Sequence, residues 1–134
     1  FRGNQLASVS IGGNVVSIGR YSFEGNLLTT VDIPNKVISI GAYAFDGNQL
    51  HELTIPSGVT SIGEYAFANN QLASVNIPDS VSEIGAGAFA SNKLTSVTLP
   101  AAINSIGILT FFNNNYLINR LLGVYRDFWH IFLS

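Results

Sequence analysis

Phenylalanine recurs along this chain at a fixed interval of 22 residues, and this repeat constrains the fold more than any other feature of the sequence. The positions are Phe1, Phe23, Phe45, Phe67, Phe89 and Phe111. Asparagine follows three residues after each phenylalanine, from Asn4 to Asn114. A repeat of this length predicts short units that cannot bury their apolar side chains alone and that stack on their neighbours. The chain is therefore expected to form a solenoid of stacked coils.

The repeating unit reads F-x-x-N-x-L-x-x-V-x-I-P-x-x-V-x-x-I-G-x-x-A. Five copies are complete, and a sixth begins at Phe111 and loses the pattern after Asn115. The L-x-x-V-x-I segment ends in the alternation typical of a strand, with Val9 and Ile11 on one face and the serines beside them on the other. A proline, which lacks an N–H group to donate, follows in most copies and ends the strand. We expect these strands to form a parallel β-sheet on the concave face of a solenoid domain spanning residues 1–115.

The second half of each unit supplies another inward pair, V-x-x-I-G, whose glycine suits a tight turn or a close backbone approach. The G-x-x-A-F segment is short and is expected to form a turn or a single helical turn. The asparagine column predicts buried amides that bond backbone groups in the turns, because buried polar groups must be satisfied. The phenylalanine column predicts stacked aromatic rings in the core.

The composition excludes several function classes. Charged residues make up 10% of the chain and the net charge is −2, without any cluster of Lys and Arg, so nucleic-acid binding is not expected. The chain has no cysteine, which excludes disulfides, thiolate metal sites and cysteine nucleophiles. No cofactor motif and no apolar run of membrane-spanning length is present. Because Phe1 opens in the middle of the pattern, we interpret the chain as a piece of a longer protein.

The outward positions of the predicted strands form two columns of small polar side chains. One column is Ser8, Thr30, Glu52, Ser74 and Ser96, and the other is Ser10, Asp32, Thr54, Asn76 and Thr98. These ten residues are the candidate binding site. They include no Trp, Tyr or Arg, the residues that dominate protein hot spots, so a weak or hydrated contact with a glycan or an extended peptide is expected. The alternative is a solvated face that binds nothing.

Three residues offer the strongest enzymatic alternative. Asp32 and Glu52 fall on adjacent strands, about 7–8 Å apart at their Cβ atoms, which is near the carboxylate spacing of an inverting glycosidase. His51 precedes Glu52, at the entrance of its strand, and is not beside both carboxylates. Catalysis also needs a pocket that shifts one pKa, and an open sheet face does not provide one. We therefore predict no catalytic residues, and no metal site either, since hard cations need several convergent oxygens.

A tyrosine column precedes the phenylalanine column by two residues, at Tyr21, Tyr43 and Tyr65. We expect it on the convex or lateral side of the solenoid. One interpretation is half-buried packing between coils. The other is an aromatic stripe for a partner or a glycan, although Gly87 and Leu109 interrupt the column.

The segment 116–134 differs from everything before it. At about 100° per residue, its polar and glycine positions from Asn119 to Ser134 fall within an arc of about 120°, which predicts an amphipathic helix. One interpretation is a cap that covers the open end of the solenoid. A helix that contacts a second partner, a dimer or a lipid surface is another, and a sequence foreign to the repeats is a third. Arg120, Arg126 and Asp127 argue against a transmembrane span, and His130 is interpreted as a solvated histidine.

The repeats resemble bacterial BspA-like (Treponema-type) leucine-rich repeats. The resemblance covers about residues 1–115 and is carried by runs such as LHELTIPSGVTSIGEYAF (50–67) and LASVNIPDSVSEIGAGAF (72–89). Asn48 and Asn70 stand where many such repeats carry cysteine. The resemblance implies a leucine-rich-repeat solenoid in a bacterial cell-surface protein, used for binding or adhesion and without catalytic residues.

The sequence therefore predicts a non-catalytic module that binds a protein or a glycan outside the cell, without a cofactor. The alternative is a purely structural spacer in a larger surface protein. A carbohydrate-active site at Asp32 and Glu52 is a remote alternative. Self-association through exposed coil ends or the tail helix is a further expected mode of interaction.

Overall fold

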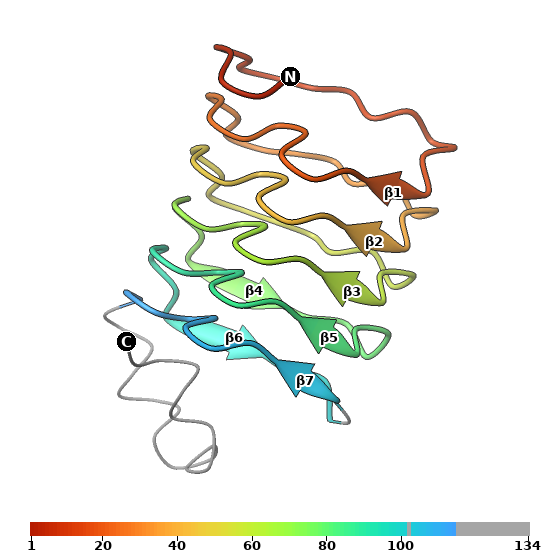
Figure 1. Ribbon diagram of the computed structural model, residues 1–134, viewed down its shortest axis with the longest axis vertical. Coiled ribbons are helices and arrows are strands. Elements are labelled where there is room, and N and C mark those ends of the chain that lie inside the picture. Colours follow the sequence, from red (N-terminus) through yellow and green to blue (C-terminus); the bar gives the residue numbers. More distant parts are fainter. Residues whose placement is uncertain (102, 115–134) are drawn as a thin grey trace.

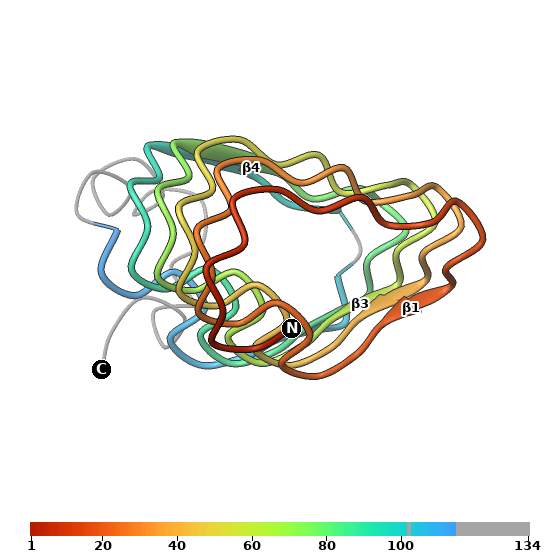
Figure 2. The same ribbon diagram turned by 90° about the horizontal axis from the view of Figure 1, so that it is seen from above.

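A computed structural model describes residues 1–101 and 103–114 and shows a stack of flattened coils with two parallel sheets (Figure 1). The larger sheet has the order β1-β2-β3-β5-β7, and the smaller one pairs β4 with β6. The strands are short: β1 Ser17–Ile18, β2 Ser39–Ile40, β3 Ser61–Ile62, β4 Ser74–Asn76, β5 Glu83–Ile84, β6 Ser96–Thr98 and β7 Ser105–Ile106. Seen along the stack, β4 lies on one long side of the coil while β1 and β3 lie on the opposite side (Figure 2).

The continuous sheet lies in a different part of the unit from the one that the sequence predicts. Strands form in the L-x-x-V-x-I segment only in β4 and β6, whereas every V-x-x-I-G segment contributes one strand to the five-stranded sheet. The glycine explains the difference. A Cβ on Gly63 would lie 2.5 Å from the backbone N of Ala42, so only glycine lets the two coils approach this closely. The Gly63 N–H then donates to Ile40 O at 2.8 Å.

The proline and the Gly-x-x-Ala segments form turns, as predicted. The N–H of Val37 donates to Pro34 O at 3.0 Å, and the same bond closes the turn after the prolines of the next two coils. The Gly-x-x-Ala segments adopt turns instead of a helix in the described coils. In the second coil, Ala44 N–H donates to Gly41 O at 3.2 Å, but Tyr43 between them has a φ of 58°. A left-handed residue interrupts the right-handed turn, so no helix propagates.

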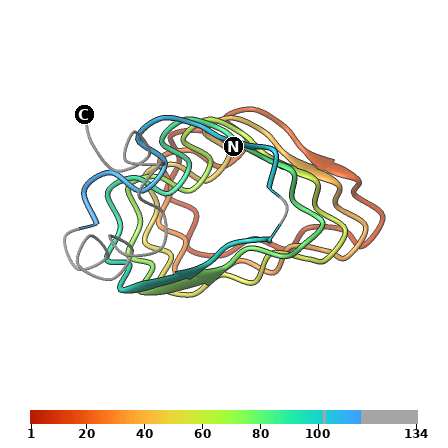
Figure 3. The ribbon, with the colours of Figure 1, turned by 90° about the horizontal axis from the view of Figure 1, so that it is seen from below.

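The phenylalanine column forms the core, which confirms the prediction. Rings from Phe45 to Phe111 are at most 1% exposed, and consecutive rings along the column stack at centroid distances of 5.3–6.0 Å. Leu, Ile and Val side chains from both sides of each coil pack around them. Viewed from below, the coils superimpose along the stack, so equivalent residues lie over one another (Figure 3). The core is therefore one apolar column that runs through the stack.

The asparagine column is buried beside the phenylalanines and bonds the backbone of neighbouring coils. The side-chain oxygen of Asn70 accepts the Leu50 N–H at 3.0 Å. Its Nδ2 lies 3.0 Å from Phe45 O in the preceding coil and 3.2 Å from Phe67 O in its own coil. The same contacts recur from Asn26 to Asn114. This asparagine ladder confirms the predicted inward hydrogen-bonding role.

The predicted boundary between a solenoid at 1–115 and a tail at 116–134 lies at the end of the described chain. Asn114, the last described residue, still accepts the Leu94 N–H at 3.0 Å and thus continues the asparagine ladder. The predicted amphipathic helix lies outside the described residues, so it stays a prediction. Within 1–101 and 103–114, no helix could cross a membrane.

Candidate binding face

The ten predicted outward side chains lie on one long side of the coils, which we call the grid face. All ten are exposed, from Ser8 and Ser10 in the first coil to Ser96 and Thr98 in β6. The residues between them, such as Val31 and Val75, point toward the core. In β4 and β6 the columns are in exact register, since Ser74 pairs with Ser96 and Asn76 with Thr98. The alternation therefore places the side chains as predicted, even where no strand is formed.

The grid face leaves its hydrogen-bonding capacity unused. Among the described residues, none of its ten side chains donates or accepts a hydrogen bond or forms an ion pair. Polar side chains elsewhere behave differently: Ser80 Oγ donates to Val59 O at 2.6 Å, and Thr110 Oγ1 donates to Gly107 O at 2.7 Å. The hydroxyl, amide and carboxylate groups of the grid face are thus available to a ligand.

A hollow of about 300 Å³ lies in the middle of the grid face. Four of the predicted site residues meet around it: Thr30, Glu52, Thr54 and Ser74. The hollow is also lined by Val31, His51 and Leu53, which the sequence reasoning did not assign to the site. The position of His51 directly before Glu52 in the sequence could have indicated that it lies beside the site. A flat sheet, however, gives no reason to expect a hollow there. The other six residues of the grid face lie outside it.

The enzymatic constellation is not assembled in one enclosed pocket. Glu52 and His51 line the hollow, but Asp32 does not. Both carboxylates are exposed on an open surface, where neither is desolvated as a catalytic acid requires. Among the described residues, no group of three His, Asp or Glu side chains is placed to hold a metal ion. Within the described residues, the three side chains of the enzymatic alternative are therefore not brought together around one hollow.

The tyrosine column packs between coils, as in the first of its two interpretations. Tyr21, Tyr43 and Tyr65 are half-buried, and their rings stack at centroid distances of 5.0 and 5.2 Å. Partial burial raises the pKa of Tyr43 above its ordinary value of 10.0, and Glu64 adds to the rise. At the end of the column, the Tyr65 ring occupies the space that a Cβ on Gly87 would need.

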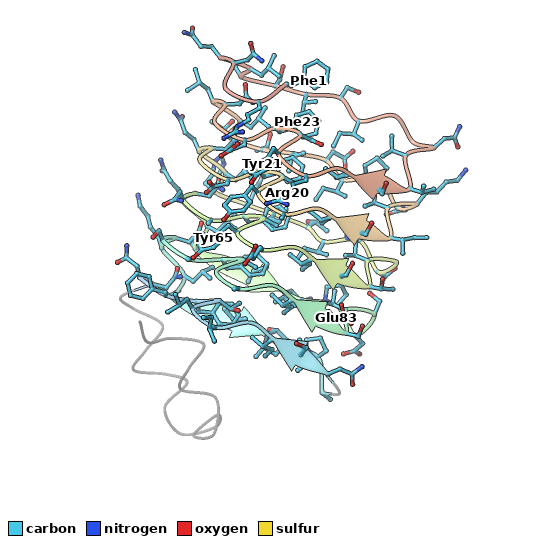
Figure 4. All side chains as sticks on the ribbon, viewed as in Figure 1. Phe1, Arg20, Tyr21, Phe23, Tyr65 and Glu83 are labelled. Atoms are coloured by element: carbon cyan, nitrogen blue, oxygen red, sulfur yellow. The ribbon has the colours of Figure 1, made fainter. Side chains whose placement is uncertain are left out.

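The remaining face of the tyrosine column is also covered. The guanidinium group of Arg20 lies 4.8 Å from the Tyr21 ring centroid (Figure 4). That of Arg2 lies 4.7 Å from the same centroid. Arg20 also donates to the Tyr21 hydroxyl at 3.0 Å, and Arg2 forms an ion pair with Glu24. Stacking of a sugar needs an open ring face, and Tyr21 is covered by the Tyr43 ring and the two guanidinium groups, while Tyr43 is stacked between Tyr21 and Tyr65. The stacked rings therefore favour the interpretation of the tyrosine column as packing between coils.

Comparison with known proteins agrees with the repeat geometry. A model of the BspA-type leucine-rich repeat region matches residues 1–118 with six copies. A leucine-rich repeat protein from Bacteroides ovatus ATCC 8483 shares the fold with a TM-score of 0.73 and 30% sequence identity. The match covers 80% of this chain but only 29% of that protein. No curated protein matches. With its six copies in register and its stacked parallel strands, the chain belongs to the BspA-type leucine-rich repeat family.

Proposed function

We propose that this chain is a non-catalytic binding module of a bacterial cell-surface protein, and that its grid face binds a protein or glycan ligand in adhesion. The observation that carries the proposal is the set of ten exposed side chains whose hydrogen-bonding groups the chain itself leaves unused. A spacer would also expose polar side chains to water, so the feature that favours binding is the hollow lined by Thr30, Glu52, Thr54 and Ser74. Membership of the BspA-type family supports the repeat-module role and a place on the cell surface.

The rigid stack suits this role, because a ligand would meet groups that are already ordered. The grid side chains sit on coils held by the asparagine ladder and the phenylalanine column, so little backbone entropy would be lost on binding. The side chains are small, and the hydroxyl groups have few rotamers to restrict. We expect a weak to moderate affinity per module, which repeated modules in a longer protein would strengthen by avidity.

The test compares two triple variants that carry similar changes on opposite surfaces. One replaces Asp32, Glu52 and Thr54 on the grid face by alanine. The control replaces Glu64, Glu83 and Asn104, which are exposed outside the grid face, by alanine. Binding of each to a panel of immobilised extracellular-matrix proteins and glycans is measured by biolayer interferometry. We expect the grid variant to lose at least about tenfold in affinity, and the control to bind like the parent chain.

Two results would overturn the proposal. If the parent chain binds nothing on the panel, the spacer interpretation is favoured. If it binds and both triple variants bind equally well, the ligand uses another surface. Circular dichroism of all three chains shows whether each remains folded, so that loss of binding is not confused with loss of structure.

A further inference from the structure

The two long sides of the coils differ in how the backbone joins one coil to the next. On the side of the five-stranded sheet the bonding runs through all five strands, and the Gly85 N–H, for example, donates to the preceding coil at 2.8 Å. On the grid face, β4 and β6 pair residues 74–76 with 96–98. Within the described chain, however, no backbone hydrogen bond joins residues 52–54 to 30–32 or to 74–76. We call residues 30–32, 52–54 and 74–76 the seam.

The backbone of the seam has the groups and the alignment that pairing requires. In stacked extended segments, the N–H and C=O groups point along the stack at the neighbouring coils. β4 and β6 use these groups, with Ser74 opposite Ser96 and Asn76 opposite Thr98. The repeat of 22 residues places 30–32 and 52–54 in the same register. The difference between the seam and the paired strands therefore lies in their side chains.

Leu53 is the inward side chain that sets the seam apart. The equivalent position holds valine in the four other coils, at Val9, Val31, Val75 and Val97. One additional methylene group in a column of stacked side chains needs room that its two neighbours must give, because protein interiors are close-packed. The hollow is centred on this position, since Leu53 and Val31 both line it and are half-buried. Val75, which is followed by Val97 in the paired strands, is only 4% exposed.

The first coil is a separate case. Residues 8–10 are also not joined to 30–32 by a backbone hydrogen bond in the described chain. This segment continues into Gly12, whereas the later coils have proline at that position. Glycine leaves the end of a segment with more conformational freedom than proline does. The missing bonds of the first coil therefore do not require an effect of Leu53.

We propose that Leu53 is a spacer residue that keeps the seam open and thereby creates the hollow of the grid face. With valine at this position, the coils would approach as closely as β4 and β6 do, and the smaller sheet would extend through residues 52–54 to 30–32. Closure would remove the space in which Thr30, Glu52 and Ser74 meet. The open seam is a property of the chain alone, whereas its effect on a ligand rests on the proposed binding function of the grid face.

Two carboxylates offer a second explanation for the open seam. Asp32 and Glu52 lie on adjacent segments, whereas β4 and β6 carry no charge, so repulsion between the carboxylates would also oppose pairing. Both side chains are exposed to water, which screens such charges and leaves them a small effect. Leu53 points toward the core, where water does not relieve a misfit in size. The steric explanation is therefore the stronger one.

Hydrogen exchange of the isotopically labelled full chain, followed by NMR, tests the proposal. In the parent chain we expect the amides of residues 52–54 to exchange at least about 100-fold faster than the Gly63 and Gly85 amides. Leu53→Val should slow the exchange of residues 52–54 at least about tenfold. The matched control is Leu99→Ile, because Leu99 is the leucine of an otherwise isoleucine column and directly follows β6, which is already paired. This control should leave the exchange of residues 52–54 unchanged.

The reciprocal variant places the larger side chain in the paired strands. Val75→Leu should separate β4 from β6, and the amides of residues 96–98 should then exchange at least about tenfold faster. The Gly63 and Gly85 amides report on the rest of the stack, and they should remain protected in every variant. Slow exchange at these two glycines therefore separates a local opening from unfolding.

Disulfide formation measures the coil spacing independently, because the chain has no cysteine of its own. The seam pair is Thr54→Cys with Asn76→Cys, and the reference pair is Asn76→Cys with Thr98→Cys, which are opposite each other in β4 and β6. A disulfide needs Cα atoms about 4.4–6.8 Å apart, which paired strands provide. We expect the seam pair to oxidise at least about tenfold more slowly than the reference pair, and Leu53→Val to bring the two rates together.

Three results would show that the inference is wrong. One is unchanged exchange of residues 52–54 in Leu53→Val together with unchanged exchange of 96–98 in Val75→Leu. Another is equal oxidation of the two cysteine pairs in the parent background. The third is closure of the seam by the double variant Asp32→Asn and Glu52→Gln, since repulsion between carboxylates would then be the cause.

Failure of the broader binding proposal is seen in a different experiment. The exchange and oxidation measurements need no ligand, so they decide whether Leu53 holds the seam open even if the parent chain binds nothing on the immobilised panel. If the parent does bind through the grid face, Leu53→Val should weaken that binding at least about tenfold, while Leu99→Ile should not. The two failures are therefore distinguishable.

Discussion

Replacing Asn70 by alanine tests whether the asparagine ladder holds the coils together. Asn70 is 6% exposed, and its side chain makes one acceptor contact and three donor contacts. The acceptor contact is with the Leu50 N–H at 3.0 Å. The donor contacts, at 3.0–3.2 Å, are with Phe45 O, Phe67 O and Ala68 O. An amide has only two N–H groups, so one of them is shared between two carbonyls.

Removing the Asn70 side chain affects its four partners unequally, so the loss of stability can be estimated partner by partner. Each of the three carbonyls keeps a second donor at 3.0–3.1 Å, from Asn48 Nδ2, Asn92 Nδ2 and Gly47 N–H. The buried Leu50 N–H loses its only partner in the described chain, and an orphaned donor of this kind costs about 1–3 kcal/mol. With the weakened carbonyl contacts included, Asn70→Ala should lower the free energy of unfolding by about 3 kcal/mol.

Urea unfolding followed by far-ultraviolet circular dichroism measures this loss. The matched control is Asn4→Ala, because Asn4 holds the same position in the repeat but is exposed and contacts only Phe1 O and Arg2 O. We expect the control to cost less than about 0.5 kcal/mol. A break in a central coil should also broaden the transition, since each coil contacts only its neighbours. A loss under about 1 kcal/mol for Asn70→Ala, or an equal loss for Asn4→Ala, would refute the reasoning.

Three further predictions concern the packing and the charge of the coils. Gly85→Ala should destabilise by at least about 2 kcal/mol, because its Cβ would lie 2.4 Å from Glu64 N, whereas Gly12→Ala, with open space around it, should have little effect in the same urea assay. Phe67→Ala should lower the free energy of unfolding by about 3–5 kcal/mol, since this fully buried ring stacks on both sides. Burial raises the pKa of the Asp46 carboxyl above its ordinary value of 3.8. The folded chain therefore keeps this proton to a higher pH than the unfolded chain does, and the free energy of unfolding falls as the pH rises from 3.8 to the pKa of the folded chain. Asp46→Asn should remove that decline, and unchanged melting temperatures between the two proteins from about pH 3 to about pH 6 would contradict the assignment.

The columns of the repeat could be predicted because identical residues 22 positions apart must occupy identical places in stacked coils. The repeat thus places the phenylalanines in the core, the asparagines against the backbone and the ten grid residues outside. Each of these placements depends only on the local pattern of polar and apolar residues and on the stacking of identical residues from successive coils. The resemblance of the runs at 50–67 and 72–89 also pointed to the family that the comparisons identify.

The position of the continuous sheet could not be predicted in the same way. Only L-x-x-V-x-I ends in the period-2 alternation of a strand, whereas the apolar residues of V-x-x-I-G lie three positions apart, so periodicity favours the segment that forms the smaller sheet. The choice depends on how closely whole coils approach, and this is set by the Gly63 column, where a Cβ would meet backbone atoms at 2.5 Å. Such a distance between two coils exists only after the coils are stacked.

What the sequence by itself determined is the solenoid, its core and the side of each coil on which polar groups are exposed, because these follow from a one-dimensional repeat. The tertiary structure alone decided that β4 and β6 are bonded, while no backbone hydrogen bond joins residues 30–32 to residues 52–54 within the described chain. It also brought Thr30, Glu52 and Ser74 from three coils around one hollow. Both outcomes depend on small differences in spacing between coils with nearly the same sequence pattern, and those differences arise from the packing of the whole stack.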